Sequence, residues 1–205
     1  MKPRYDSVRA IAELKEADPT LAAIIERCGP FELRLHRSSG LFPSLLGSII
    51  SQQLHGKAAA SIHRRVLALT GTPPSPASIE SLDDESLRSA GLSANKLRAV
   101  RDLAAKNQAG VVPDMRAAAK LADEELVERL TTVRGIGPWT VHMLLMFKLG
   151  RPDVLPIGDF AIRLAFSKFF CDGRKATPSQ LLKHAEKWRP WRSVASWYLY
   201  RSLDD

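Results

Sequence analysis

Apolar residues recur at helical spacing along most of this chain. Within residues 42–54, for example, Leu45, Leu46, Ile49 and Ile50 are separated by intervals of three and four. No segment alternates apolar and polar residues with the period of two that a half-buried strand requires. The pattern therefore predicts an all-α fold. Helices are expected over 6–17, 20–28, 42–54, 57–69, 81–90, 94–108, 113–121, 123–131, 138–149, 160–170, 178–188 and 191–203, with a loop or short extended piece over 31–40.

Capping signals mark the starts of several predicted helices. Ser81, with Asp84 three residues on, resembles a capping box, and Ser93 precedes the helix expected over 94–108. Thr177 is followed by Pro178 and by Gln180, which suits a cap, a first-turn proline and a reciprocal partner at the third position. These signals divide the chain into short helices joined by tight turns.

The stretch from Leu130 to Asp159 contains the most informative motif of the chain. Gly135-Ile136-Gly137 separates two helical patterns, and glycines let the backbone turn sharply and approach a bulky group. Pro138 suits the first turn of the second helix. The stretch is therefore predicted to form a helix–hairpin–helix whose exposed backbone N–H groups bind an anion, with a DNA phosphate as the obvious ligand.

Charge supports a polyanionic partner. The 205-residue chain is 45% hydrophobic, enough for a normal core, and carries a net charge of +8. From Arg129 onward there are 13 Lys and Arg against 6 Asp and Glu, so the basic excess lies with the hairpin and the residues after it. A merely solubilising surface is the alternative interpretation.

Cysteine usage and hydropathy exclude several classes of protein. Cys28 and Cys171 are too few and too far apart for a CxxC zinc site, a four-cysteine iron–sulfur cluster or a disulfide framework. They are expected to be free thiols in a reducing compartment. Residues 1–10 lack the apolar core of a signal peptide, and no run reaches the roughly 20 apolar residues of a membrane helix. An intracellular protein without membrane contact is expected.

Asp159 is the first candidate for chemistry. It opens a helical pattern after Gly158, so a simple N-cap is the ordinary interpretation. A phosphate held at the hairpin would, however, bring a nucleotide near the loop that leads to Asp159. One carboxylate there could stabilise positive charge developing on a deoxyribose and orient or deprotonate a water.

Aromatic and polar residues around this stretch suggest how a base could be handled. Trp139 is either a core aromatic or a wall that stacks on an extruded base, and Tyr200 and Trp197 are similar candidates. An aromatic pocket favours positively charged bases. The polar cluster containing Gln53 and His55 either caps a helix or enters a DNA groove. Gln52 belongs to the same polar cluster. Lys57 and Arg134 are candidate cations for DNA phosphates.

The combination of motifs resembles the helix–hairpin–helix DNA glycosylases with a Gly/Pro-rich loop and a catalytic Asp (HhH-GPD), specifically the alkylbase or DNA-3-methyladenine glycosylase II branch in its compact form, without the N-terminal β-domain. The resemblance rests on five stretches, which are SQQL with KAA at 51–59, GLS with Lys96 at 91–96, VRGIGPWT at 133–140, LPIGD at 155–159, and WRPWRS through YLY at 188–200.

The resemblance implies a role for each matching position. Asp159 would be the catalytic carboxylate, and Gln53 or His55 would plug the duplex from the minor groove. Trp139 and Tyr200 would form the base pocket. The phosphate-binding hairpin would comprise Thr132, Arg134, Gly135, Ile136 and Gly137, and the backbone carbonyls of Thr131, Val133 and Gly135 would hold a structural Na+ or K+, with no other cofactor.

Two positions bear on chemistry and substrate. Bifunctional relatives have a Schiff-base lysine where this chain has Trp139, so a monofunctional glycosylase without lyase activity is expected. Met143 stands where some relatives have an aromatic residue. A pocket with less aromatic surface is expected to suit cationic 3-methyladenine and 7-methylguanine better than neutral ethenoadenine or hypoxanthine.

The resulting expectation is one glycosylase domain over 1–205 that cleaves the N-glycosidic bond of alkylated purines in duplex DNA. One helical lobe would span about 38–153 with the hairpin at 131–138, and the other 1–37 with 154–205, around a DNA-binding cleft. The protein would act as a monomer in the cytoplasm or nucleoid of a bacterium or the nucleus of a eukaryote. The alternatives are a non-catalytic DNA-damage binder and a glycosylase for mismatched or oxidised bases.

Overall fold

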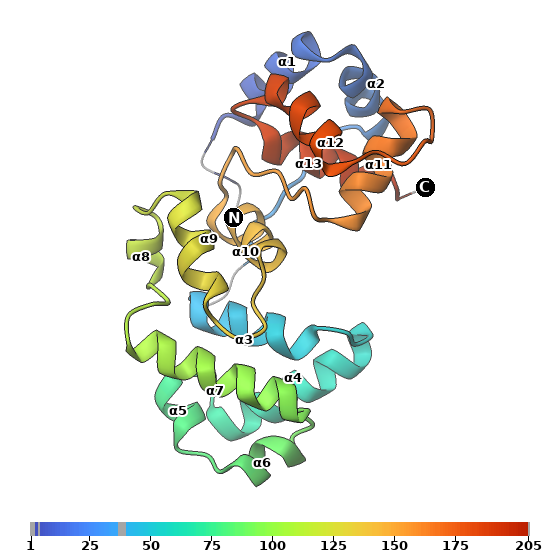
Figure 1. Ribbon diagram of the computed structural model, residues 1–205. Coiled ribbons are helices and arrows are strands. Elements are labelled where there is room, and N and C mark those ends of the chain that lie inside the picture. The colour runs from blue at the N-terminus through green and yellow to red at the C-terminus, as the bar shows by residue number, and fades with distance from the viewer. Residues whose placement is uncertain (1–2, 4, 37–39, 205) are drawn as a thin grey trace. The chain divides into compact units, whose positions relative to one another are not determined.

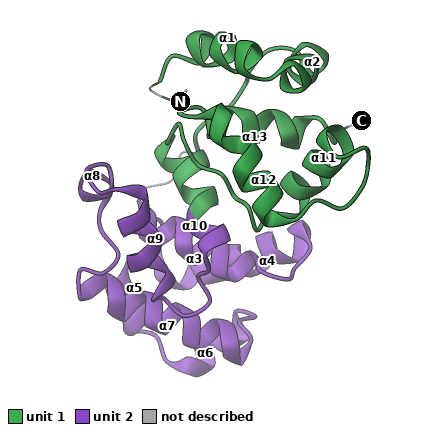
Figure 2. Ribbon diagram, turned by 45° about the horizontal axis from the view of Figure 1, so that its top comes forward, with its two compact units in different colours: residues 1–37, 142–205 green, residues 38–141 purple. Residues whose placement is uncertain are grey.

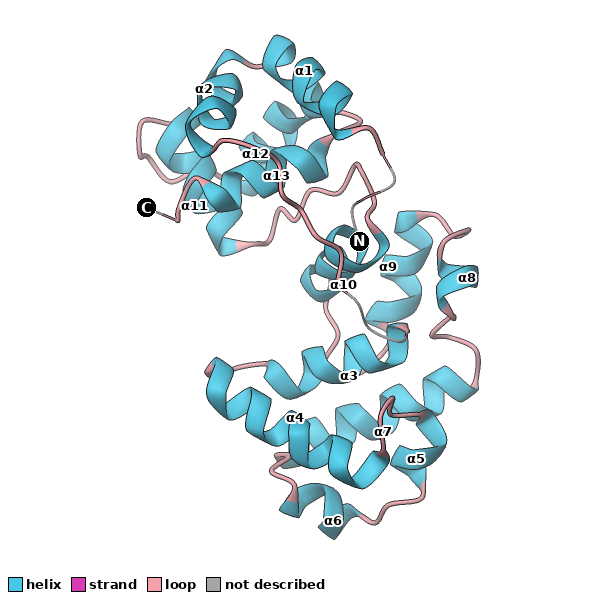
Figure 3. Cartoon of the chain, turned by 180° about the vertical axis from the view of Figure 1, so that it is seen from behind, coloured by secondary structure: helices cyan, strands magenta, loops and turns pink. Residues whose placement is uncertain are grey.

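The computed structural model describes residues 3, 5–36 and 40–204, and these are helical with no strand among them (Figures 1 and 3). This confirms the all-α prediction. The tail of the loop expected over 31–40 lies outside the described residues at 37–39. The elements are α1 (Ser7–Ala17), α2 (Pro19–Cys28), α3 (Leu41–Ser51), α4 (Gly56–Thr70), α5 (Pro76–Glu80), α6 (Asp84–Ser89), α7 (Ala94–Gln108), α8 (Met115–Ala118), α9 (Asp123–Thr131), α10 (Pro138–Leu144), η1 (Leu145–Leu149), α11 (Phe160–Phe170), α12 (Pro178–His184), η2 (Ala185–Trp188) and α13 (Arg192–Arg201).

The chain divides into two compact units (Figure 2). Unit 1 contains residues 1–37 and 142–205, and unit 2 contains residues 38–141. The boundary differs from the one expected after residue 153, because the segment after Val141 packs with unit 1. The backbone carbonyl of Phe147 accepts the His36 N–H at 2.8 Å, and the centroid of the Phe147 ring lies 6.3 Å from that of the Tyr200 ring.

Unit 2 is built around α3 and α7, which pack against each other. The apolar positions at helical spacing in α3, Leu45, Leu46, Ile49 and Ile50, are fully buried, as the periodicity predicted. On α7, Val100 faces the same core. Residues at the end of α3 and on α7 contact the hairpin, since Gln52 binds the Gly135 carbonyl and Asp102 binds the Arg134 N–H.

Unit 1 buries its core between α1, α2, α11 and α13, with Trp188 and Tyr198 as the largest enclosed side chains. Helix α13 is buried continuously from Ser193 to Leu199, so it passes through the middle of the unit. A helix enclosed on all sides is a rigid support for a side chain at its end.

Several predicted helix boundaries require correction, among them that of the helix expected over 113–121, which is shortened to Met115–Ala118. Ser81 does not start a helix. Instead, Ser75 and Ser78 form the capping box of α5, Ser81 ends that helix, and the Asp83 side chain caps α6. The helix expected over 138–149 changes from α to π geometry at Leu145, and the one expected over 178–188 ends in a 3-10 turn. The capping box predicted at Thr177 and Gln180 is confirmed.

Candidate functional site

Asp159 lies at the start of α11 and is 7% exposed. Its carboxylate accepts the Ile162 N–H at 3.0 Å, which is the ordinary bond of an N-cap. Its own N–H donates to the Pro156 carbonyl at 2.9 Å, which tightens the preceding turn. The capping interpretation is thus correct, but a carboxylate has lone pairs beyond those that one cap uses.

Tyr200, at the end of α13, supplies a second contact to Asp159. Burial raises the pKa of the Tyr200 phenol well above its ordinary value, and the negative charge of Asp159 and a hydrogen bond to its carboxylate raise it further. Tyr200 therefore remains a neutral hydroxyl over the physiological range, able to donate a hydrogen bond to the carboxylate.

The side chains around Tyr200 form a small apolar and aromatic cluster in unit 1. The Tyr200 hydroxyl lies 3.7 Å from the Met143 sulfur, and the Phe147 ring flanks the tyrosine. Phe147 in turn stacks on His36, with ring centroids 6.0 Å apart. The sequence predicted Met143 and Tyr200 as pocket residues. It did not predict Phe147, although the spacing of four residues from Met143 on one helix could have indicated it.

Trp197 does not belong to this cluster. It is 9% exposed and packs edge-on against Phe31, with ring centroids 4.8 Å apart. It also contacts Tyr198 within the core of unit 1. The suggestion that Trp197 faces a base was therefore wrong, because the fold covers the side of α13 on which it lies.

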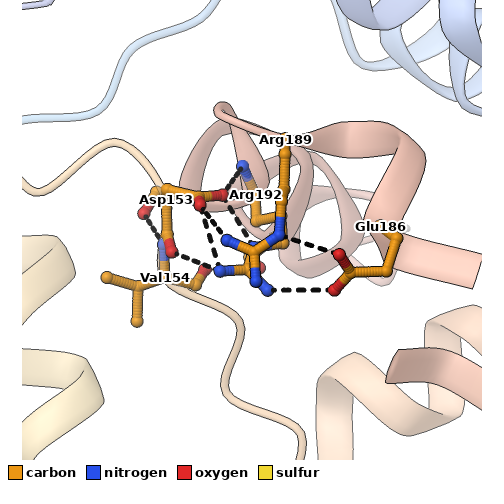
Figure 4. A network of polar contacts seen from close by, with 7 residues as sticks. Asp153, Val154, Glu186, Arg189 and Arg192 are labelled. Carbon is orange, nitrogen blue, oxygen red and sulfur yellow. Dashed lines mark hydrogen bonds and ion pairs between the residues drawn. The ribbon is translucent and has the colours of Figure 1, made fainter. Parts of the chain in front are cut away.

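An ion-pair network holds the segment that leads to Asp159 (Figure 4). The Asp153 carboxylate is bound by Arg192 Nε at 2.7 Å, Arg192 Nη2 at 3.0 Å and Arg189 Nη1 at 2.6 Å. The Arg192 guanidinium also donates to the Asp153 carbonyl at 3.0 Å, and the Val154 N–H donates to the Ser193 hydroxyl at 2.9 Å. The Asp159 loop is thus attached to the first turn of α13, whose last turn carries Tyr200.

The hairpin lies in unit 2, between α9 and α10. Gly135 has a φ of 79°, in the left-handed region that favours glycine. The Ile136 N–H donates to the Val133 carbonyl at 3.0 Å, and the Arg134 N–H donates to the Asp102 carboxylate at 2.6 Å. Among the described residues, the N–H groups of Gly135 and Gly137 have no protein acceptor. Of the backbone N–H groups in the turn that were expected to bind an anion, those of Gly135 and Gly137 remain open.

Two of the three carbonyl groups expected to hold a monovalent cation already have protein partners. The Gly135 oxygen accepts Gln52 Nε2 at 2.7 Å, and the Val133 oxygen accepts the Ile136 N–H at 3.0 Å. The neighbouring carbonyl of Thr132 accepts the ammonium of Lys106. Each of these oxygens keeps a second lone pair, but the ammonium bound at Thr132 places a positive charge on the adjacent peptide, which disfavours a further cation there. Within the described ranges, no group of three or more His, Cys, Asp or Glu side chains could hold a metal ion.

The turn between α3 and α4 divides the predicted polar cluster. Gln52 points to the hairpin, whereas Gln53 and His55 are exposed. Gln53 adopts a φ of 56°, a left-handed conformation that is uncommon for a residue other than glycine. Leu54 is 37% exposed, and Lys57 is exposed in the first turn of α4. The turn therefore presents polar and apolar side chains to solvent.

Trp139 is 50% exposed in the first turn of α10, so the core-aromatic interpretation does not hold. It belongs to unit 2 with the hairpin, whereas Asp159, Tyr200 and Met143 belong to unit 1. Sequence reasoning missed Phe160, which directly follows Asp159 and is 77% exposed. An exposed phenylalanine beside a buried carboxylate provides apolar contact surface at the candidate site.

The two units differ in charge. Unit 1 contains 18 Lys and Arg against 12 Asp and Glu, and unit 2 contains 12 against 10. The basic excess predicted for the second half of the chain therefore belongs mainly to the unit with Asp159, not to the unit with the hairpin. Separately, the helices in the described part of the chain are all too short or too polar to cross a membrane.

The chain is similar in sequence and in fold to known DNA repair proteins. Residues 46–190 match the family described as "HhH-GPD superfamily base excision DNA repair protein". DNA-3-methyladenine glycosylase 1 of Schizosaccharomyces pombe is 39% identical over 163 residues, which cover 78% of this chain and 72% of that protein. A Bacillus halodurans DNA-3-methyladenine glycosidase structure aligns with a TM-score of 0.88 at 31% identity, covering 100% of this chain and 92% of that one. The S. pombe 3-methyladenine DNA glycosylase Mag1 in complex with abasic DNA aligns with a TM-score of 0.81 at 34% identity, covering 94% and 95%.

Proposed function

The chain belongs to the HhH-GPD superfamily of base excision DNA repair proteins, and from that premise we propose that it is a monofunctional DNA glycosylase for alkylated purines. The observation that carries the proposal is Asp159, a buried carboxylate that both caps α11 and interacts with Tyr200, which lies in an apolar cluster. Similarity to named DNA-3-methyladenine glycosylases over most of both chains supports the same activity.

The reaction follows from the charge at this site. When an N-glycosidic bond breaks, positive charge develops on the deoxyribose, and a fixed carboxylate stabilises it. Asp159 would supply that charge and guide a water to C1′. A base that is already cationic leaves without a second acid, so one carboxylate suffices. Because Tyr200 stays protonated, it would orient Asp159 without adding a competing negative charge.

Substrate binding requires the base to leave the stack. Tyr200 and Met143 in unit 1 would contact the extruded base. Aromatic faces attract cations. We therefore propose 3-methyladenine and 7-methylguanine as the preferred substrates. With Trp139 in place of an amine nucleophile, the product would be an abasic site with an intact backbone.

Unit 2 would supply the groups that hold duplex DNA. The open N–H groups of Gly135 and Gly137 would bind one backbone phosphate, and Arg134 and Lys57 would be exposed cations for others. The exposed turn carrying Gln53 and His55 would fill the space left by the flipped base. We propose that the protein acts as a monomer wherever the genome is kept, in a bacterial nucleoid or a eukaryotic nucleus.

The decisive variant is Asp159→Asn. Asparagine caps a helix about as well as aspartate, so α11 should keep its stability while the negative charge is lost. Base release from methylated duplex DNA, measured by chromatography, should fall by about 100- to 10,000-fold. Affinity for a duplex with an abasic-site analogue should persist. Asp83→Asn, which alters the equivalent cap of α6, is the matched control and should leave base release unchanged.

The same assay separates the other candidate functions. A non-catalytic damage binder would show no base release from the wild-type protein, and near wild-type release by Asp159→Asn would refute the assigned role. A panel of mismatched, oxidised and alkylated duplexes would identify another substrate class. A covalent adduct trapped by borohydride would contradict the monofunctional mechanism.

A further inference from the structure

Two side chains of α7 bind the hairpin backbone. The Asp102 carboxylate accepts the Arg134 N–H at 2.6 Å, and the Lys106 ammonium donates to the Thr132 carbonyl. The two side chains also bind each other, with 2.9 Å between Lys106 Nζ and Asp102 Oδ2. They are four residues apart, so one turn of a helix holds the backbone on both sides of Val133.

Asp102 and Lys106 are together called the α7 brace, and their opposite charges neutralise each other. Asp102 and Lys106 are only 30% and 28% exposed, so solvent screens their charges incompletely. Burial raises the pKa of Asp102, but the hydrogen bonds from Arg134 and Lys106 lower it by more, so it stays ionised. An unpaired carboxylate close to the Gly135 turn would repel a phosphate, and the Lys106 ammonium cancels that charge.

The same ammonium binds a carbonyl of the hairpin, next in sequence to two of the three carbonyls expected to hold a cation. The Gly135 oxygen accepts the Gln52 amide and the Val133 oxygen accepts the Ile136 N–H, while Lys106 binds the oxygen of Thr132. A monovalent cation would have to compete with these bonds and with a fixed positive charge. The hairpin thus already contains the charge and the cross-links that such an ion would provide.

We propose that Lys106 and Asp102 are positioning residues for DNA binding, and that the Lys106 ammonium replaces a monovalent cation in the hairpin. The inference rests on the proposed function in that the hairpin binds duplex DNA. It predicts that affinity for DNA is independent of the identity of the monovalent cation, and that Lys106→Met makes affinity depend on that identity.

The experiment measures Kd for a duplex with an abasic-site analogue at one ionic strength in potassium, sodium or tetramethylammonium chloride. The bulky tetramethylammonium ion is too large to be chelated by carbonyl groups. The wild-type Kd should agree across the three salts within about twofold, since general screening is equal. Lys106→Met should bind about tenfold more weakly in tetramethylammonium, a loss of about 1.4 kcal/mol, and recover in part in potassium or sodium. Lys106→Arg, which keeps a cationic donor, should bind nearly as the wild type.

Lys120→Met is the matched control, because it removes an exposed lysine of unit 2 that lies outside the hairpin and α7. The proposal is overturned if wild-type binding weakens more than about tenfold without potassium or sodium. It is equally overturned if Lys106→Met and Lys120→Met behave alike in all three salts.

A second measurement needs no DNA. Amide hydrogen exchange over residues 131–137 should be faster in Lys106→Met and in Asp102→Ala than in the wild type, with the Arg134 amide most affected. Unchanged exchange would refute the α7 brace. Faster exchange in a protein that binds no DNA or releases no base would leave the brace standing and reject the proposed function, so the two failures are distinguishable.

Discussion

The Asp153–Arg192 ion pair offers a quantitative test of how the fold supports Asp159. Arg192→Ala removes two charge-assisted bonds to the Asp153 carboxylate and one to its carbonyl. Breaking a buried pair costs about 3–5 kcal/mol. Asp153 is 23% exposed and keeps its bond to Arg189, so the cost here should be about 2–3 kcal/mol. For a chain of this size, that corresponds to a fall in Tm of about 4–12 °C.

The assay combines thermal unfolding with steady-state base release over a range of substrate concentrations. Because the pair attaches the Asp159 loop to α13, kcat should fall while KM changes little. Arg192→Lys should restore less than half of the lost stability, because an ammonium cannot bind a carboxylate in two places at once. A double-mutant cycle with Asp153→Asn should give a coupling energy of about 1.5–3 kcal/mol.

The matched control for this pair is Arg9→Ala. The Arg9–Glu13 pair has a similar distance of 2.6 Å, but its side chains are 68% and 40% exposed, so its loss should have little effect on Tm. If Arg192→Ala were no more destabilising than Arg9→Ala, the pair would not be a structural clamp. If stability fell but kcat did not, the clamp would have no part in positioning Asp159.

Two further predictions concern a buried acid and the hairpin glycine. Burial raises the pKa of Asp18, but hydrogen bonds from Trp188 and His184 lower it by more, so its stabilisation is complete above about pH 4 and declines as pH falls below that value. The free energy of unfolding of Asp18→Asn should therefore be about 2–3 kcal/mol lower than that of the wild type at pH 7, and the difference should shrink in acid. Urea unfolding at several pH values would measure this. A difference that is equal at every pH would contradict the mechanism. Gly135→Ala should lose about 1–2 kcal/mol from strain at φ 79° and should also weaken DNA binding. Gly110→Ala, at φ 76° in open space, should show the strain alone, and equal DNA affinities of the two variants would exclude a role for the Gly135 turn.

Local features of the fold were predictable from the sequence because they depend on neighbours in the chain. A cap such as Thr177 bonds three residues ahead, and apolar residues three or four apart share a helix face wherever the helix lies. The wrong start at Ser81 shows the limit of such rules, because Ser75 and Asp83 lie on either side of it and cap the helices that form.

Long-range packing decided what the candidate site contains. Trp139 and Trp197 are equally plausible pocket residues in the sequence, yet one is half exposed and the other is buried in the core. Asp102 and Lys106 read as an ordinary pair on a helix surface, and only the fold brings them to the hairpin backbone.

By itself, the sequence determined the helical elements, the hairpin, and Asp159 as a cap with a further role. The tertiary structure decided which hairpin N–H groups remain open, what holds Asp159 in place, and which aromatic side chains are exposed. The physical reason is that helix periodicity and caps arise within a few residues, whereas burial and charge compensation depend on residues that are distant in the chain.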